Sequence, residues 1–272
     1  MRLVRILFIG DVSGSAGRRA VSKLLRALRS RLGIHFTIVN GENAAGGLGI
    51  THPTAANLFD AGADVITLGN HAFAKRDVVA YFKEEMRILR PANFPPGVPG
   101  RGWGVFKAST GDKIVVANLL GRTFMTPVDC PFRAADTMLE ELNGDAKIIL
   151  VDMHGEATSE KVALGWYLDG RVSAVIGTHT HIQTADERIL PKGTAYLTDA
   201  GMTGVQDSVL GLDVESVIER FLTQVPPKFL LAEGTAVLNG VVMDVDPETG
   251  HAVSIRRIIL DESGEGLETI SF

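Results

Sequence analysis

The stretch that decides the fold, residues 4–43, reads VRILFIGDVSGSAGRRAVSKLLRALRSRLGIHFTIVNGEN. It begins with the apolar run Val4–Ile9, continues with Val and Leu at helical spacing over Arg18–Leu32, and reaches a second apolar run at Phe36–Val39. Because neither run alternates apolar with polar residues, both are expected to be strands buried on both faces. Strand, helix and strand in this order predict a right-handed crossover and a parallel pair.

The same pattern continues along the chain. Thr51 is expected to cap a helix that runs to about Ala61, and Asp77 to cap a helix after the next strand. The segments Phe106–Ala108 and Lys113–Leu120 are typical of a hairpin. Four further apolar runs predict buried strands: Val65–Leu68, Ile114–Leu120, Ile148–Val151 and Ala174–Ile176. From Ala195 onward the pattern predicts antiparallel strands and one helix at Val214–Leu222, so the sheets should be mixed.

Composition narrows the class of protein. The chain has 272 residues, 45% of them hydrophobic and 22% charged, which favours one globular domain over residues 1–272. The formal net charge of -5 excludes a dominant basic face for duplex nucleic acid. A lone cysteine, Cys130, predicts a reducing compartment and hence the cytoplasm. The first apolar run contains Arg5 and stops at Asp11, so it is too short for a signal peptide or a membrane span.

Polar side chains follow the predicted strands where each strand ends. In open α/β sheets ligands bind at the carboxyl edge, so these residues are expected to meet there. A single such residue is more often an ordinary turn residue, but the conjunction points to a functional site. Four of the seven histidines belong to the set. Its members are Asp11, Asn40, Glu42, Asn43, Asn70, His71, Asp152, His154, His179 and His181.

Imidazole, carboxylate and carboxamide together form a mixed nitrogen and oxygen ligand set. Such a set suits Mn²⁺, Fe or Zn²⁺ better than Ca²⁺. The candidates are too many for one coordination sphere. Two ions that share a carboxylate would polarise a phosphoryl group and generate hydroxide, so the residues favour a dinuclear site.

The ordered motifs resemble the calcineurin-like metallophosphoesterases, and more narrowly the YmdB-type bacterial phosphodiesterases. The matching stretches are LFIGDVSGSAGR, TIVNGENAAGGLGIT, GNHAF, RPANFP, NLLGRTFM, HGEATSEKVALGWYLDGRVSAVIGTHTHIQTAD and ILPKGTAYLTDAGMTG. They extend from residue 6 to about residue 245. The resemblance implies an α/β fold in which two mixed β-sheets pack as a sandwich with flanking helices.

The resemblance also implies roles for single residues. One metal would be held by Asp11, Glu42, Asn43 and His181. The other would be held by Glu42, Asn70, His154 and His179, with Glu42 bridging. His71 would face the substrate and act as proton donor. The wider superfamily has Asp-x-His where this chain has Asp11-Val12-Ser13, and Asp where it has Glu42. A carboxamide ligand is harder than imidazole, so iron or manganese is favoured, with zinc as the alternative.

The implied reaction is attack of a metal-bridging hydroxide on a phosphodiester. Cyclic nucleotides are the expected substrates, the strained 2′,3′-cyclic form ahead of the 3′,5′-cyclic form, and RNA ends are a further candidate. A phosphomonoesterase and a metal- or nucleotide-binding regulator with little turnover stay open as alternatives. A nicotinamide-dependent oxidoreductase is disfavoured because the glycines at 10, 14 and 17 lack the required spacing. No membrane partner is expected, and a homo-oligomer is left open.

Features outside these motifs give weaker signals. Arg122, in NLLGRTF, could contact a phosphate, although an arginine in a loop is more often solvated. Phe124, Trp166 and Tyr167 could stack on a base, but burial is the favoured interpretation for each.

Overall fold

The strand–helix–strand unit predicted at the N-terminus forms in the computed structural model, which describes residues 2–226 and 230–264. β1 (Val4–Ile9) pairs in parallel with β3 (Phe36–Asn40), and α1 (Gly14–Leu32) connects them. The helix begins four residues before the predicted apolar stripe, because its first turn is built from small residues. A Cβ at Gly17 would overlap the carbonyl oxygen of Thr203, so glycine permits this close approach.

The larger sheet has eight strands in the order β2-β12-β13-β1-β3-β4-β5, with β14 paired to β13. β1, β3, β4 and β5 are parallel, whereas β13 runs antiparallel to β1, β12 and β14. Its remaining strands are β2 (Asp11–Val12), β4 (Val65–Thr67), β5 (Ile88–Leu89), β12 (Met202–Val205), β13 (Ala236–Val245) and β14 (Ala252–Asp261). The predicted mixture of parallel and antiparallel strands is confirmed.

The smaller sheet has six strands in the order β10-β11-β9-β8-β7-β6. Its four central strands are parallel, and β6 forms the predicted hairpin with β7. One expectation fails, because β11, which begins at Ala195, pairs in parallel with β9. The strands are β6 (Trp103–Lys107), β7 (Lys113–Leu120), β8 (Ile148–His154), β9 (Ala174–Thr178), β10 (Arg188–Ile189) and β11 (Ala195–Leu197).

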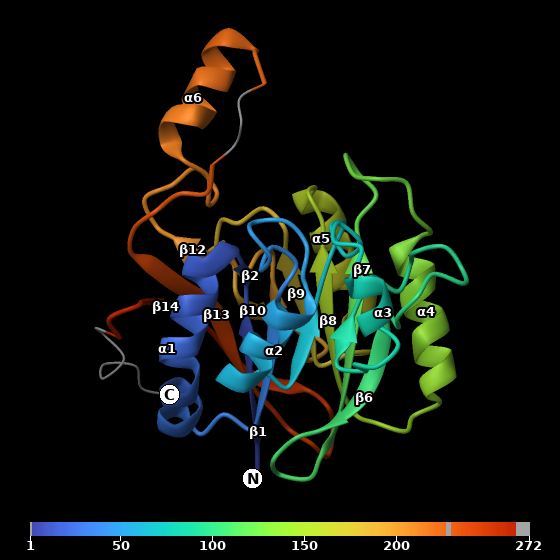
Figure 1. Cartoon of the computed structure of the whole chain (residues 1–272). Helices are drawn as coiled ribbons and strands as arrows, with labels where there is room; N and C mark the ends of the chain where they lie inside the picture. Colours follow the sequence, from blue (N-terminus) through green and yellow to red (C-terminus); the bar gives the residue numbers. More distant parts are fainter. Residues whose placement is uncertain (1, 227–229, 265–272) are drawn as a thin grey trace.

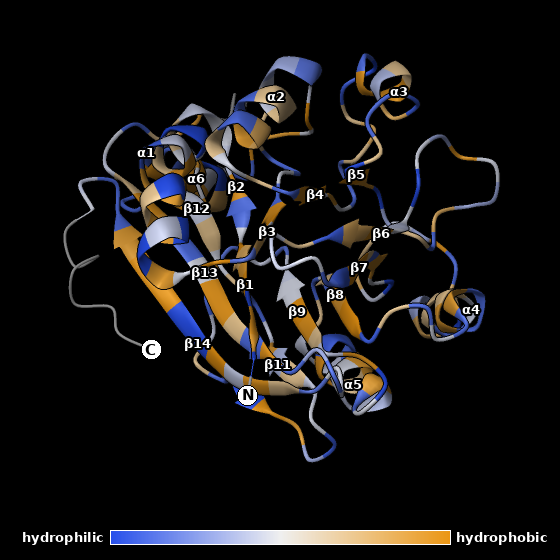
Figure 2. Cartoon of the chain, turned by 90° about the horizontal axis from the view of Figure 1, so that it is seen from below, coloured by the Kyte–Doolittle hydropathy of each residue, from blue (hydrophilic) through white to orange (hydrophobic). Residues whose placement is uncertain are grey.

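The sheets pack face to face and helices cover their outer faces, as Figure 2 shows. Ile6 and Phe8 of β1 lie in the apolar layer between the sheets, whereas Leu7 and Ile9 pack against α1 and α2. Both faces of the strand are therefore buried, which explains its unbroken apolar sequence. On the other side, α4 and α5 cover the six-stranded sheet with a third apolar cluster. The predicted sandwich with flanking helices is confirmed.

The helices match the sequence expectations unevenly. Thr51 caps α2 (His52–Ala61) as predicted, but α3 (Val78–Tyr81) is a single turn and Asp77 makes no side-chain cap hydrogen bond. Two helices were not predicted, α4 (Pro131–Leu142) and α5 (Thr158–Leu168).

A sixth helix, α6 (Val214–Thr223), lies at the predicted place and stands away from the sheets in Figure 1. Phe221 and Leu222 on it are largely exposed. None of the described helices is both long and apolar enough to cross a bilayer. A single domain over residues 1–272 stays a prediction, since residues 1, 227–229 and 265–272 lie outside the described part.

Candidate metal centre

The carboxyl ends of strands from both sheets meet at one edge of the sandwich. Asp11 begins β2, Glu42 follows β3, and Asn70 and His71 follow β4, all in the eight-stranded sheet. His154 ends β8, and His179 and His181 follow β9 in the six-stranded sheet. Because parallel strands end at the same edge, residues that are far apart in sequence meet there. The structure brings together every residue predicted from the motifs.

Four of these residues form an inner cluster: Glu42, Asn70, His154 and His179. His154 Nε2 lies 3.0 Å from Glu42 Oε2, 3.0 Å from His179 Nδ1 and 3.1 Å from Asn70 Oδ1. Ligand atoms of Glu42, His154 and His179 all lie within 4.8 Å of one another. This convergence matches the size of a coordination sphere.

Three residues form an outer cluster: Asp11, Asn43 and His181. His181 Nε2 lies 3.9 Å from Asp11 Oδ1 and 3.1 Å from Asn43 Nδ2. The Asn43 oxygen would face His181 after a flip of the amide, which exchanges two atoms of similar size. Glu42 links this cluster to the inner one through its sequence neighbour Asn43 and through His71 Nδ1, which lies 3.4 Å from Asn43 Oδ1.

Two buried oxygens in the site lack a hydrogen-bond donor among the described residues: Asp11 Oδ1 and Glu42 Oε2. A buried carboxylate oxygen without a partner is strongly unfavourable. Glu42 Oε2 has an imidazole nitrogen 3.0 Å away, but the geometry is not that of a hydrogen bond. A cation placed between these atoms would satisfy both oxygens, so the residues present fit metal ions.

The tautomer of His154 follows from its neighbours. Thr178 Oγ1 donates its proton to Asp152 Oδ1 at 2.7 Å, so it must accept from His154 Nδ1 at 2.9 Å. His154 Nδ1 therefore carries a proton, and Nε2, which faces Glu42 and Asn70, is the nitrogen that would bind a metal ion in place of a proton. Asp152 is fixed in turn by Asn40 and Thr67, which donate to its Oδ2 at 3.0 Å and 2.5 Å.

The pKa shifts of the site residues show that the buried carboxylates favour a positive charge beside them. Burial opposes charging of His154, but the carboxylates of Glu42, Asp11 and Asp152 outweigh it and raise its pKa to about 9. Burial raises the pKa of Asp11, and it raises the pKa of Asp152 to about 6. Burial and the neighbouring positive charge of His154 lower the pKa of His179 to about 3. Divalent ions would supply the charge that a proton supplies here.

The loop that carries His179 and His181 has an unusual backbone. Both residues are left-handed, with φ of 99° and 66°, a conformation that costs free energy for residues other than glycine. Between them, Thr180 donates through its amide and its hydroxyl to Asp199 Oδ2, at 3.0 Å and 2.7 Å. Asp199 is neutralised by Lys161 Nζ at 2.7 Å, and both partners of this ion pair are buried.

His71 lies beside both clusters and contacts Glu42 and Asn43. Its Nδ1 lies 2.8 Å from Glu42 Oε1, and its side chain is 36% exposed. With Nδ1 held by the carboxylate, Nε2 is the ring nitrogen left to meet a substrate. Gly69 precedes the pair Asn70-His71. No residue with a side chain fits at this position, because a Cβ would overlap Glu42 Oε2 and His154 Nε2.

The sequence does not predict three residues that support the site: Thr178, Lys161 and Asp199. Asp152 belongs to the polar strand-end set, but the sequence assigns it no ligand role. A signal existed for Asp152, because it precedes His154 by two positions on β8 and must share its face. Lys161 and Asp199 lie 38 positions apart, and no local pattern relates them. The burial expected for Phe124 is wrong, since this ring is 89% exposed, and Trp166 and Tyr167 are also exposed.

Comparison with known proteins shows which proteins this chain resembles over its length. A protein of Bacillus subtilis (strain 168) named 2′,3′-cyclic-nucleotide 2′-phosphodiesterase is 52% identical over 259 residues, which cover 95% of this chain and 98% of the relative. The crystal structure of a novel phosphatase from Mycoplasma pneumoniae superposes with a TM-score of 0.90 at 34% identity, covering 100% of this chain and 98% of that one.

A crystal structure of a hypothetical protein from Thermus thermophilus gives a TM-score of 0.89 at 44% identity, covering 95% of this chain and 99% of that one. The family model described as "YmdB-like protein" matches residues 7–258. The resemblance predicted from the motifs is thereby confirmed. The chain belongs to the YmdB-like protein family.

Proposed function

We propose that this chain holds two transition-metal ions and opens 2′,3′-cyclic phosphodiesters of nucleotides. The chain is a metal-dependent phosphoric ester hydrolase of the phosphodiesterase class. The observation that carries the proposal is the pair of buried oxygens without donors, Asp11 Oδ1 and Glu42 Oε2, beside His154 Nε2. The name of the Bacillus subtilis relative supports the 2′,3′-cyclic substrate.

The proposed ligands divide as the two clusters do. Glu42, Asn70, His154 and His179 hold the inner ion. Asp11, Asn43 and His181 hold the outer ion, with Glu42 shared between both. Bound divalent ions would polarise the phosphoryl oxygens and lower the pKa of water toward neutrality. Because the ligands are nitrogen and oxygen atoms, with two carboxamides among them, iron or manganese is favoured over zinc.

His71 completes the proposed chemistry as the proton donor. The oxygen that leaves phosphorus is an alkoxide of ribose, which is a poor leaving group without a proton. His71 is held through Nδ1 by Glu42, and its exposed ring can present Nε2–H to that oxygen. A five-membered cyclic phosphate is strained, so it should react faster than a 3′,5′-cyclic phosphate. RNA that ends in a 2′,3′-cyclic phosphate presents the same group.

The test is hydrolysis by protein reconstituted with Mn²⁺ or Fe²⁺. Adenosine 2′,3′-cyclic phosphate should be opened fastest, followed by bis-p-nitrophenyl phosphate and adenosine 3′,5′-cyclic phosphate. Metal content should approach two ions per chain by elemental analysis. No uptake of either metal would overturn the dinuclear proposal. Uptake without turnover of any ester would favour the metal- or nucleotide-binding regulator.

One observation favours the phosphomonoesterase as the second candidate. Arg18 donates to the carbonyl oxygen of Ala44, directly after the ligand Asn43, which places a fixed cation beside the ligand loop. A monoester carries a second negative charge that such a cation would stabilise. If mononucleotides release phosphate faster than cyclic nucleotides open, the monoesterase is the correct assignment. A homo-oligomer and a cytoplasmic location remain predictions that neither candidate requires.

A further inference from the structure

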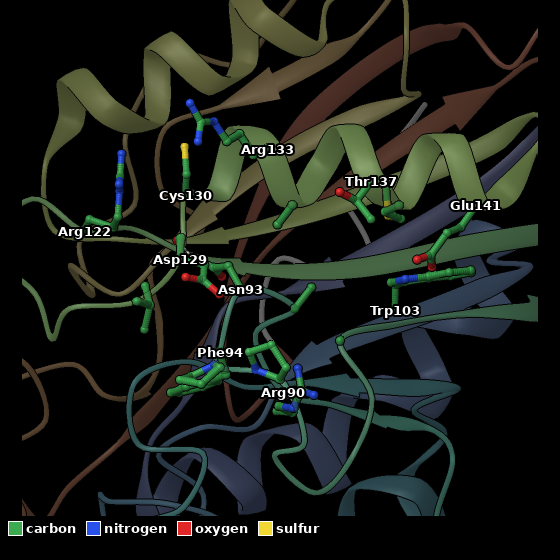
Figure 3. Close-up of a pocket in the computed structure, with 17 residues that line it drawn as sticks. Arg90, Asn93, Phe94, Trp103, Arg122, Asp129, Cys130, Arg133, Thr137 and Glu141 are labelled. Carbon is green, nitrogen blue, oxygen red and sulfur yellow. Dashed lines mark hydrogen bonds between the residues drawn. The ribbon is translucent and has the colours of Figure 1, made fainter.

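A cavity of about 740 Å³ opens between α4 and the segments around residues 90–96 and 102–103. Figure 3 shows its lining side chains. Its volume lies in the range of small-molecule sites. None of the seven proposed metal ligands lines it, so it is distinct from the metal centre.

Two contacts place this cavity beside the catalytic edge. Phe94 in its wall packs edge-on against Phe73 with 5.7 Å between ring centroids, and Phe73 follows His71 by two positions. The amide of Gly121 donates to the carbonyl of His154 at 2.8 Å, and the next residue, Arg122, lines the cavity. Through these contacts the cavity adjoins the segments that carry His71 and His154.

One end of the cavity is cationic. Figure 3 shows Arg122 and Arg133 on either side of Cys130 at this end. Within residues 2–226 and 230–264, neither guanidinium forms an ion pair. Arg90 also lines the cavity, and its guanidinium donates to four backbone carbonyls, which leave its charge uncompensated. Arginine side chains that have no carboxylate partner bind phosphate groups favourably.

The opposite end of the cavity carries an aromatic ring and a hydrogen-bond acceptor. Trp103 and Glu141 lie together there in Figure 3. Arg133 and Glu141 are eight positions apart on α4, so the two ends are separated by about 12 Å along the helix. An indole face can stack on a nucleobase, and a carboxylate can accept from an exocyclic amino group. Asp129 lies beside Cys130 at the arginine end in Figure 3, where its carboxylate can accept from a ribose 2′-hydroxyl.

An exposed aromatic ring lies on the same loop as Arg122. Phe124 is 89% exposed, and its φ of 62° lies in the left-handed region that residues other than glycine rarely adopt. Exposed aromatic rings beside arginines are typical of surfaces that bind single-stranded nucleic acid without strict sequence preference.

We propose that this cavity binds the nucleotide preceding the 2′,3′-cyclic end of an RNA strand, with its phosphate at Arg122 and Arg133 and its base at Trp103. The inference rests on the proposed function, because it assumes that the cyclic phosphate lies at the metal centre. RNA extends from that terminal nucleotide only through the 5′-oxygen, and the next group along it is a phosphodiester anion. A free cyclic mononucleotide would leave the cavity empty.

The experiment compares two substrates: adenosine 2′,3′-cyclic phosphate and adenylyl-(3′→5′)-adenosine 2′,3′-cyclic phosphate. The dinucleotide should have a kcat/KM about tenfold or more above that of the mononucleotide, the scale of one stacked base or phosphate contact. Arg122→Ala, Arg133→Ala and Phe124→Ala should each lower this ratio toward one. All three residues are exposed, so these variants should fold normally. The matched control is Arg26→Ala, an exposed arginine on α1, which should keep the ratio.

A binding measurement tests the cavity without turnover. In a Trp166→Phe background, the fluorescence of Trp103 should respond to the 3′-phosphorylated dinucleotide product and not to adenosine 3′-phosphate. An equal response to adenosine 3′-phosphate, weakened by Arg122→Ala, would make the cavity a site for free nucleotides and overturn the proposal. A substrate ratio of one in the wild-type protein would overturn it too. If neither substrate is hydrolysed, the proposed function itself has failed.

Discussion

The inner and outer clusters of the candidate metal centre differ in how firmly the protein holds their ligands. In the inner cluster, Glu42 and His154 are fully buried, and His154 is fixed through Thr178 by a buried carboxylate. In the outer cluster, His181 Nδ1 contacts a loop carbonyl, that of Leu210, at 3.1 Å, and no buried carboxylate among the described residues fixes its ring.

Exposure does not separate the clusters, since the side chains of His179 and His181 are 22% and 15% exposed. One ligand of each cluster lies on a strand, His154 on β8 and Asp11 on β2, and the others lie on loops, so the difference rests on how His154 is oriented.

Because of this difference, we expect the two ions to bind with different affinities. A ligand whose orientation is fixed before binding loses less conformational freedom on coordination, so its site binds more tightly. The inner ion should therefore be retained during purification, and the outer ion should exchange. Each prediction below either removes this difference or measures it.

The largest effect is expected for Glu42→Ala, which removes the only residue assigned to both clusters. Both ions should be lost together, and kcat/KM should fall by more than about 10³-fold, the upper range for one electrostatic contact. Elemental analysis and hydrolysis of adenosine 2′,3′-cyclic phosphate measure the two losses. The control is Glu140→Gln, an exposed carboxylate on α4 outside the site, which should keep both ions. Retention of two ions by Glu42→Ala would show that Glu42 is not shared.

Separate removal of one ligand from each cluster tests the difference directly. His181→Ala should retain close to one ion per chain and lose at least about 10²-fold in activity, since charge stabilisation by the second ion disappears. His154→Ala should lose the inner ion. If His181→Ala empties the inner cluster as well, the two halves bind cooperatively and the distinction between them is wrong.

His71→Ala should keep both ions and lose about 10²-fold in kcat, the lower range for loss of a general acid. The loss should be smaller on bis-p-nitrophenyl phosphate, because a phenolate leaves without a proton. Comparable losses on the nitrophenyl and ribose esters would argue against proton donation by His71. Loss of an ion in this variant would make it a ligand.

Asp152→Asn gives the smallest and most selective effect. It keeps the shape of the side chain but weakens the orientation of His154 through Thr178. The affinity for the inner ion should fall by about 10–100-fold, the usual range for a residue that supports a ligand, while the outer ion is little affected. Metal titration followed by competition with a chelator measures both affinities. Equal weakening at the two sites would remove the proposed link between Asp152 and the inner cluster.

The parts of the molecule that could be predicted are those whose signal lies within one short segment of the sequence. The buried strands and the polar residues at their ends follow from apolar runs and position, so Asp11, Glu42 and His154 were found without a structure. α4 had a readable signal, with Pro131 in its first turn and Ala135, Met138 and Leu142 on one face.

Other parts depend on contacts between distant segments. Thr178 acquires its role only where β8 and β9 lie side by side, and Lys161 only where α5 meets Asp199. The cavity beside α4 is closed by residues as far apart as Arg90 and Glu141, and no spacing rule joins them. The expectation for Phe124 fails because a large aromatic ring is normally buried, whereas the loop holds this one in water.

The buried ion pair between Lys161 and Asp199 has a consequence for the order of folding. An ammonium group cannot be buried before its partner arrives, because an uncompensated buried charge costs about 3–5 kcal/mol. Docking of α5 and pairing of β11 with β9 must therefore occur as one cooperative event. Because Asp199 also holds Thr180, the loop of His179 and His181 takes its shape in that same event. The two histidines of this loop thus reach their places at the sheet edge only once α5 and β11 have packed together.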